Sequence, residues 1–153
     1  MSDPDKPEAV WTNAPTAKER NALQREVVAL LDELAPERVL SRGEPLRLPI
    51  EQHRTPEGCI LQAPTAALSV SWFAGGGGDR KLGELRIIVW RGVLSRRGSP
   101  VRREAASVVR ELVFHPVERP TSDKVWRDAS AAEYDTPSLA SICLSLLKEQ
   151  VEG

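Results

Sequence analysis

The chain has 153 residues and a formal net charge of −1, with 41% hydrophobic and 28% charged residues. These values are ordinary for a soluble globular protein, and the length suffices for one hydrophobic core without disulfides or a structural metal. No run approaches the roughly 20 apolar residues that span a bilayer, and the N-terminus lacks the basic and apolar regions of a signal peptide. We therefore expect a cytoplasmic protein that does not insert into a membrane.

The N-terminal part of the chain predicts a flexible segment followed by a helix. Residues 1–15 contain three prolines and no hydrophobic period, so we expect them to be flexible and 16–153 to form a single α+β domain. A capping-box pattern, with Thr16 as N-cap and Glu19 three residues later, predicts a helix over 17–35 that Pro36 ends. Its apolar face carries residues at helical spacing: Leu23, Val27, Leu30, Leu31 and Leu34.

Four strands are predicted next, over 46–50, 59–62, 66–73 and 82–94. Pro49 lacks an N–H, so the first strand is expected at a sheet edge. The third alternates apolar residues with serines, which indicates one buried face. The last is apolar on both faces, which is typical of a strand in the middle of a sheet. The glycines at 75–78 lead into a strand rather than a helix, so they predict a hairpin tip and not a phosphate-binding loop.

The segment 100–113 fits two secondary structures. Read as a strand from Ser107 to Val117, its second half would place Arg110 on one face and Glu111 on the other. As a helix it gathers its apolar residues on one face, and Ser99 and Pro100 suit the N-cap and the first helical position. We therefore predict a helix over 100–113.

The C-terminal part predicts a fifth strand over 123–127 and a final helix over 137–151. Thr136 is the expected N-cap and Pro137 the first helical residue. The predicted architecture is thus α+β, with an antiparallel sheet of about four to five strands packed against helices 17–35, 100–113 and 137–151.

Candidate catalytic and metal-binding residues are few. The two histidines, His53 and His115, lie beside no candidate nucleophile in the sequence, and with Cys59 and Cys143 they lack the close spacing of zinc ligands. We predict no catalytic residue, no metal site and no cofactor. The cysteines fit two buried thiols, the alternative being a disulfide between them.

Positive charge is concentrated between residues 79 and 103, where eight basic residues face two acids. Such a patch attracts anionic partners even when the whole chain is nearly neutral. Arginines in the first turn of the predicted helix 100–113 would also surround a helix N-terminus, which binds phosphate or carboxylate. The candidate anion or nucleic-acid contacts are Arg80, Lys81, Arg96, Arg97, Arg102 and Arg103.

The run from Arg102 to Leu112, a basic pair followed by an amphipathic stretch, resembles the last helix of double-stranded-RNA-binding domains. In that family a lysine pair opens the helix and contacts phosphates across the RNA major groove, so the resemblance assigns these contacts to Arg102 and Arg103. It extends over 66–113 at most. The chain departs from the family in carrying a further helix after this segment and no matching first helix close before the strands.

Three functional hypotheses follow. The first is a non-catalytic interaction domain, acting as an adaptor, a chaperone or a subunit of an assembly, with another protein or a second copy of itself as partner. The helix–sheet–helix order is loosely similar to small secretion chaperones, a likeness of layout only. The second hypothesis is binding of a nucleic-acid duplex or backbone through the arginine-rich region. The third is a small enzyme whose site the sequence does not reveal.

Overall fold

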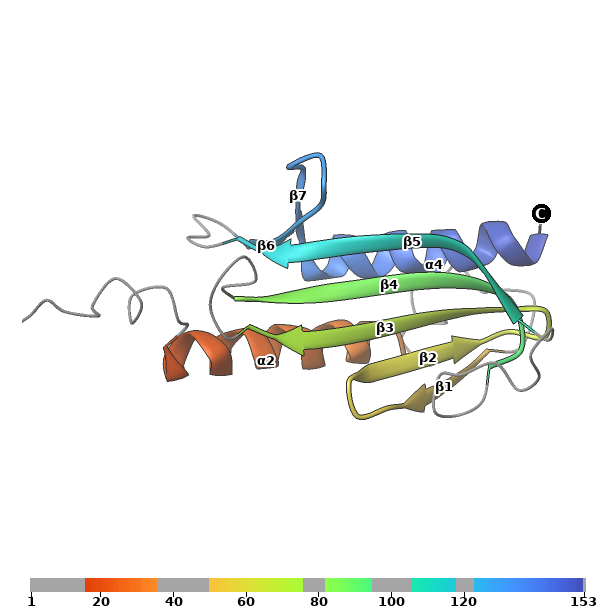
Figure 1. The fold of residues 1–153 in the computed structure, drawn as a ribbon, viewed down its shortest axis with the longest axis horizontal. Coiled ribbons are helices and arrows are strands. Elements are labelled where there is room, and N and C mark those ends of the chain that lie inside the picture. Colours follow the sequence, from red (N-terminus) through yellow and green to blue (C-terminus); the bar gives the residue numbers. More distant parts are fainter. Residues whose placement is uncertain (1–15, 36–49, 76–81, 95–105, 118–122, 153) are drawn as a thin grey trace, which may run out of the picture.

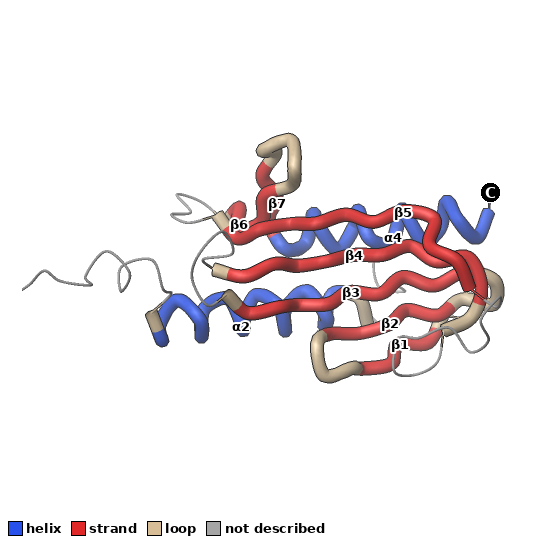
Figure 2. The backbone as a smooth tube through the Cα atoms, viewed as in Figure 1, coloured by secondary structure: helices blue, strands red, loops and turns tan. Residues whose placement is uncertain are grey.

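The structure is a computed structural model that describes residues 16–35, 50–75, 82–94, 106–117 and 123–152. These residues form seven strands and two helices, and every strand pairs antiparallel with its neighbour in the chain, in the order β1 to β7. Both helices lie on the same side of the sheet (Figures 1 and 2). The elements are α2 (Ala17–Glu33), β1 (Glu51–Arg54), β2 (Gly58–Gln62), β3 (Ala66–Ala74), β4 (Gly83–Gly92), β5 (Ala106–Pro116), β6 (Lys124–Arg127), β7 (Glu133–Asp135) and α4 (Thr136–Glu152).

The start of α2 confirms the predicted capping box. The Thr16 hydroxyl accepts a hydrogen bond of 3.0 Å from the Glu19 N–H, and Oε1 of Glu19 accepts one of 2.8 Å from the Thr16 N–H. Two of the N–H groups that a helix start leaves without partners are thereby satisfied. The helix then buries three of its predicted apolar residues, Val27, Leu30 and Leu31, against the sheet.

The core lies between the two helices and one face of β3 and β4. Alternate residues of the two strands face each other across it, with Val70 opposite Ile87 and Leu68 opposite Val89. β4 stands fourth of seven strands, which confirms the prediction that its apolar run lies in the middle of the sheet. The cysteines are both free and buried in this core, in agreement with the thiol interpretation.

The predicted helix over 100–113 is wrong from residue 106 onward. Residues 106–116 form β5, which pairs with β4 from Ala106 opposite Gly92 to Phe114 opposite Leu85. A register shift between Val89 and Trp90 marks a bulge in this pairing, and it displaces the apolar residues from strict alternation. The helical spacing was therefore coincidental, because long-range pairing with β4 decided the structure. Residues 100–105 lie outside the described residues.

The other predictions differ from the structure mainly in their bounds. Strands 59–62, 66–73 and 123–127 correspond to β2, β3 and β6, and helix 137–151 corresponds to α4. Of the predicted strand 46–50, residues 46–49 lie outside the described part and Ile50 is not in a strand; the first strand described is β1. The sheet has seven strands rather than four to five, because 106–116 is a strand and the three residues of β7 carry no period of their own.

The start of α4 also differs from the prediction. Asp135, not Thr136, accepts the hydrogen bond from the Ser138 N–H, at 2.7 Å. Thr136 is the first residue of the helix and is only 4% exposed. Its hydroxyl accepts from Nε1 of Trp126 and donates to Glu26, which connects β6, α4 and α2.

Candidate functional site

The face of the sheet that points away from α2 and α4 is covered by no described helix (Figure 1). Side chains alternate along a strand, so the residues between the core positions lie on this side. We call this side the open face. It carries Ser69, Ser71, Phe73, Glu84, Arg86, Ile88, Trp90, Val108, Glu111, Val113 and His115.

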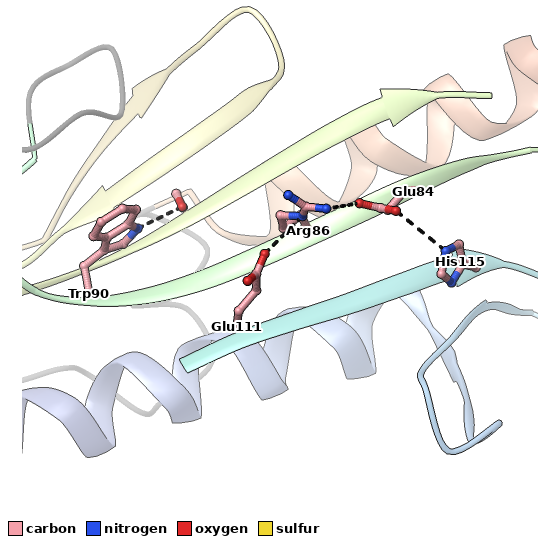
Figure 3. Close-up of polar contacts among 6 residues, drawn as sticks. Glu84, Arg86, Trp90, Glu111 and His115 are labelled. Carbon is pink, nitrogen blue, oxygen red and sulfur yellow. Dashed lines mark hydrogen bonds and ion pairs between the residues drawn. The ribbon is translucent and has the colours of Figure 1, made fainter. Parts of the chain in front are cut away.

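An ionic network runs across the open face from β4 to β5 (Figure 3). One terminal nitrogen of Arg86 lies 2.6 Å from Oε2 of Glu84, and its Nε lies 3.1 Å from Oε2 of Glu111. The second contact is an ion pair only, because the Nε–H does not point at an acceptor. Nε2 of His115 lies 3.9 Å from Oε1 of Glu84. The Glu84 carboxylate therefore lies between the guanidinium of Arg86 and the imidazole of His115.

Aromatic side chains flank this network at both ends. The Phe73 ring lies 5.9 Å from Cζ of Arg86 and remains 40% exposed. At the other end, Nε1 of Trp90 donates to the Ser69 hydroxyl at 3.0 Å. Trp90 also packs on a small second apolar cluster, whose buried members are Ile60, Ala67 and Leu94. The open face thus combines oriented charges with accessible aromatic surface.

Most of the outer edge of β5, beside this face, pairs with no described strand. Its pairing with β6 involves only His115 and Pro116, so along 106–114 no described strand lies on the side away from β4 (Figure 1). Such an edge offers backbone N–H and C=O groups to another strand. It also carries the two most exposed large hydrophobic side chains of the described residues, Val108 at 54% and Val109 at 43%.

A second concave region lies on the other side of the molecule, between α2 and the start of β6. It consists of a pocket of about 210 Å³, lined largely by aliphatic residues, and a pocket of about 420 Å³ with a more acidic lining. Glu26 and Val125 line both pockets, so the two lie next to each other. We call this region the acidic groove.

The basic residues that the sequence singled out fall outside the part of the chain that the structure describes. They are Arg80, Lys81, Arg96, Arg97, Arg102 and Arg103. The resemblance to double-stranded-RNA-binding domains required a helix up to Leu112, and that stretch is part of β5 from residue 106. The helix from Arg102 to Leu112, on whose N-terminus the predicted anion contacts depended, is therefore not formed from residue 106 onward.

The candidate nucleophiles and ligands are also dispersed. His53 lies 3.7 Å from Glu51 on β1, and His115 lies beside Glu84 on the opposite part of the sheet. Burial raises the pKa of the Cys59 thiol to about 12 and raises the pKa of Cys143 as well, so both thiols are protonated and unreactive at neutral pH. Within the described ranges no group of three or more His, Cys, Asp or Glu residues could hold a metal ion.

The ionic network was missed from the sequence although one signal of it is visible. Glu84 and Arg86 are two residues apart in an apolar strand, a spacing that places both side chains on one face. Glu111 could join them only once residue 111 was known to lie in a strand opposite Ile88. The helix prediction concealed this pairing.

Comparison of the chain with protein-family models, with curated proteins and with solved structures gives no match. Among the helices of the described residues, neither combines the length and the hydrophobicity that crossing a membrane requires.

Proposed function

We propose that this chain is a non-catalytic protein-interaction domain, which docks a partner protein on the open face and on the adjoining edge of β5. The observation that carries the proposal is the exposure of Val108 and Val109 on residues 106–114 of β5, beside which no described strand lies on the side away from β4. Natural proteins normally protect long apolar edges with charges, prolines or a covering element. An edge that keeps its valines exposed suits a partner that covers them.

The chemistry of the open face supports the same use. Arginine and aromatic residues are enriched at the centres of protein interfaces, and here Arg86 lies between the exposed Phe73 ring and the Trp90 side. Glu84 and Glu111 already neutralise Arg86 within the domain. A partner therefore meets charges that are paired and oriented, which lowers the ordering cost of binding and favours specificity over raw affinity.

The test compares two valines with similar exposure on different faces. Val108→Glu places a carboxylate on the β5 edge, whereas Val28→Glu places one on α2, where Val28 is 42% exposed. Wild-type protein and both variants are used as bait in native extract, with and without nuclease, and retained proteins are quantified by mass spectrometry. We expect partners that wild type and Val28→Glu retain, that Val108→Glu loses, and that nuclease treatment leaves unchanged.

Two outcomes of this comparison would contradict the proposal. Retention of the same proteins by Val108→Glu would remove the β5 edge from the interface. Loss of all partners after nuclease treatment would favour the nucleic-acid hypothesis instead. Far-ultraviolet circular dichroism of both variants establishes that they are folded, and light scattering over a range of concentrations shows whether the partner is a second copy of the chain.

A further inference from the structure

We infer that the acidic groove is a second docking site, which receives a short peptide segment of another protein carrying an aliphatic side chain next to lysine or arginine. The site lies between α2 and β6, on elements that take no part in the open face. It is independent of the function proposed above, because its residues and its partner chemistry differ.

The smaller pocket is the part of the groove that would bind the aliphatic side chain of the peptide. Its walls include Leu23, Leu82, Val117 and Val125, and it also contains Ala22 on the exposed side of α2. The volume of about 210 Å³ lies below the roughly 300–1,000 Å³ of pockets for drug-sized molecules. It therefore suits one anchoring side chain of a longer segment rather than a whole small molecule.

The larger pocket is the part of the groove whose charge indicates a basic peptide. Five carboxylates line the two pockets, and the single basic residue among the described lining residues is Arg25. The carboxylates are Glu19, Glu26, Glu33, Asp123 and Asp135. A concave surface with such an excess of one sign focuses its field and attracts the opposite charge, so the complementary segment is basic.

Internal hydrogen bonds hold several of these carboxylates in place before any ligand arrives. Glu19 accepts from the Thr16 N–H, Glu26 from the Thr136 hydroxyl and Asp135 from the Ser138 N–H. A carboxylate offers about four acceptor positions, so each retains capacity for an incoming ammonium or guanidinium group. Hydrogen bonds from Ser138, with help from the charge of Lys124, also hold the pKa of Asp135 below its usual range.

The test selects ligands from a phage-displayed library of random dodecapeptides with the full chain as bait. Selected peptides are synthesised with a fluorescent label and titrated by anisotropy against two groove variants and two matched controls. Ala22→Trp fills the aliphatic pocket and Glu33→Lys reverses a charge of the acidic one. Their controls are Gln24→Trp, on an exposed position of α2 that does not line the groove, and Glu149→Lys, on the exposed side of α4.

We expect selected sequences that combine an aliphatic residue with adjacent lysine or arginine. Each groove variant should weaken their binding about tenfold or more, while the controls stay within about twofold of wild type, and added salt should weaken binding in all. Three outcomes would overturn the inference: no enrichment over a bait-free selection, enrichment of acidic or uncharged peptides, or peptides whose affinity falls with Val108→Glu but not with Ala22→Trp. The last outcome would assign them to the open face, so failure here is distinguishable from failure of the proposed function.

Discussion

The hydroxyl of Thr136 donates a hydrogen bond of 2.7 Å to Oε1 of Glu26, a residue 110 positions earlier in the chain. The same hydroxyl accepts from Nε1 of Trp126 at 3.1 Å. Trp126 is fully buried, and the indole N–H of a buried tryptophan requires an acceptor. One threonine hydroxyl therefore gives the buried indole N–H of β6 its acceptor and also links α4 to α2.

Replacing this threonine should destabilise the fold without changing its shape. Thr136→Val keeps the volume but leaves the Trp126 N–H without its acceptor and Glu26 without its donor. We expect the free energy of unfolding to fall by about 2 kcal/mol, the cost of an unsatisfied buried polar group, as measured by urea denaturation. The control Thr65→Val, at an exposed position between β2 and β3, should leave it nearly unchanged. Equal free energies of unfolding for the two variants would show that the Thr136 hydroxyl does not stabilise the fold.

The ionic network of the open face makes a second prediction about stability. Arg86→Leu removes the guanidinium that lies 2.6 Å from the carboxylate of Glu84, whose side chain is only 8% exposed. We expect a loss of about 1–2 kcal/mol, because the Glu84 carboxylate is shielded from water whereas Arg86 is 39% exposed, so the pair lies between a buried and a surface ion pair.

Arg54→Leu provides the matched comparison for this second prediction. Arg54 pairs with Asp32 at 3.1 Å, but both side chains are about half exposed or more, and surface pairs of this kind contribute less than about 1 kcal/mol. Denaturation of the two variants under identical conditions measures the difference. A smaller loss of stability in Arg86→Leu than in Arg54→Leu would show that the Glu84 carboxylate is not shielded from solvent.

The start of α4 predicts a pH dependence of stability. Hydrogen bonds from Ser138 are the main cause of the lowered pKa of Asp135. Because the folded state holds this pKa below the unfolded value of about 4, the stabilisation is present at neutral pH and is lost as the pH falls below about 4 through the folded pKa. Asn is an equally good helix cap, so Asp135→Asn removes only the charge.

The expected result is a stability difference between wild type and Asp135→Asn that is largest near neutral pH and narrows toward about pH 2.5. Urea denaturation at a series of pH values measures this difference. Asp128, whose pKa is also lowered, mainly by the Tyr134 hydroxyl, is present in both proteins and contributes equally. A difference that grows as the pH falls would have the wrong sign for a carboxylate with a lowered pKa.

The buried cysteines give a prediction about reactivity. With the pKa of Cys59 at about 12 and that of Cys143 also raised by burial, very little thiolate exists at pH 8, and both sulfurs lie in the core. A water-soluble aromatic disulfide reagent should therefore leave the native protein unmodified for hours and should modify both thiols in strong denaturant. Rapid modification of native protein would show that the core opens around Cys59 or Cys143.

Sequence patterns predicted those elements whose own residues determine them. The capping box of Thr16 and Glu19 and the long apolar run of β4 are local features, and both were located correctly. The segment 106–113 satisfies helical spacing as well as strand propensity, so only its pairing with β4 could decide between the two. The same limit applies to the open face, because the contact between Arg86 and Glu111 depends on a register that no local pattern contains. The acidic groove likewise forms only when α2 and β6 are brought together.

The order of the elements has a consequence for synthesis of the protein. Every strand pairs with its neighbour in the chain, so hairpins can form one after another as the polypeptide emerges from the ribosome. The apolar side of β3 and β4, however, remains partly exposed to solvent until α4, the last described element, has been synthesised and packs against it. A chain that stalls before α4 would present that surface to chaperones and proteases, since incompletely buried sheets are prone to aggregate. Within the described part of the chain, synthesis of α4 is therefore the step that completes burial of this surface.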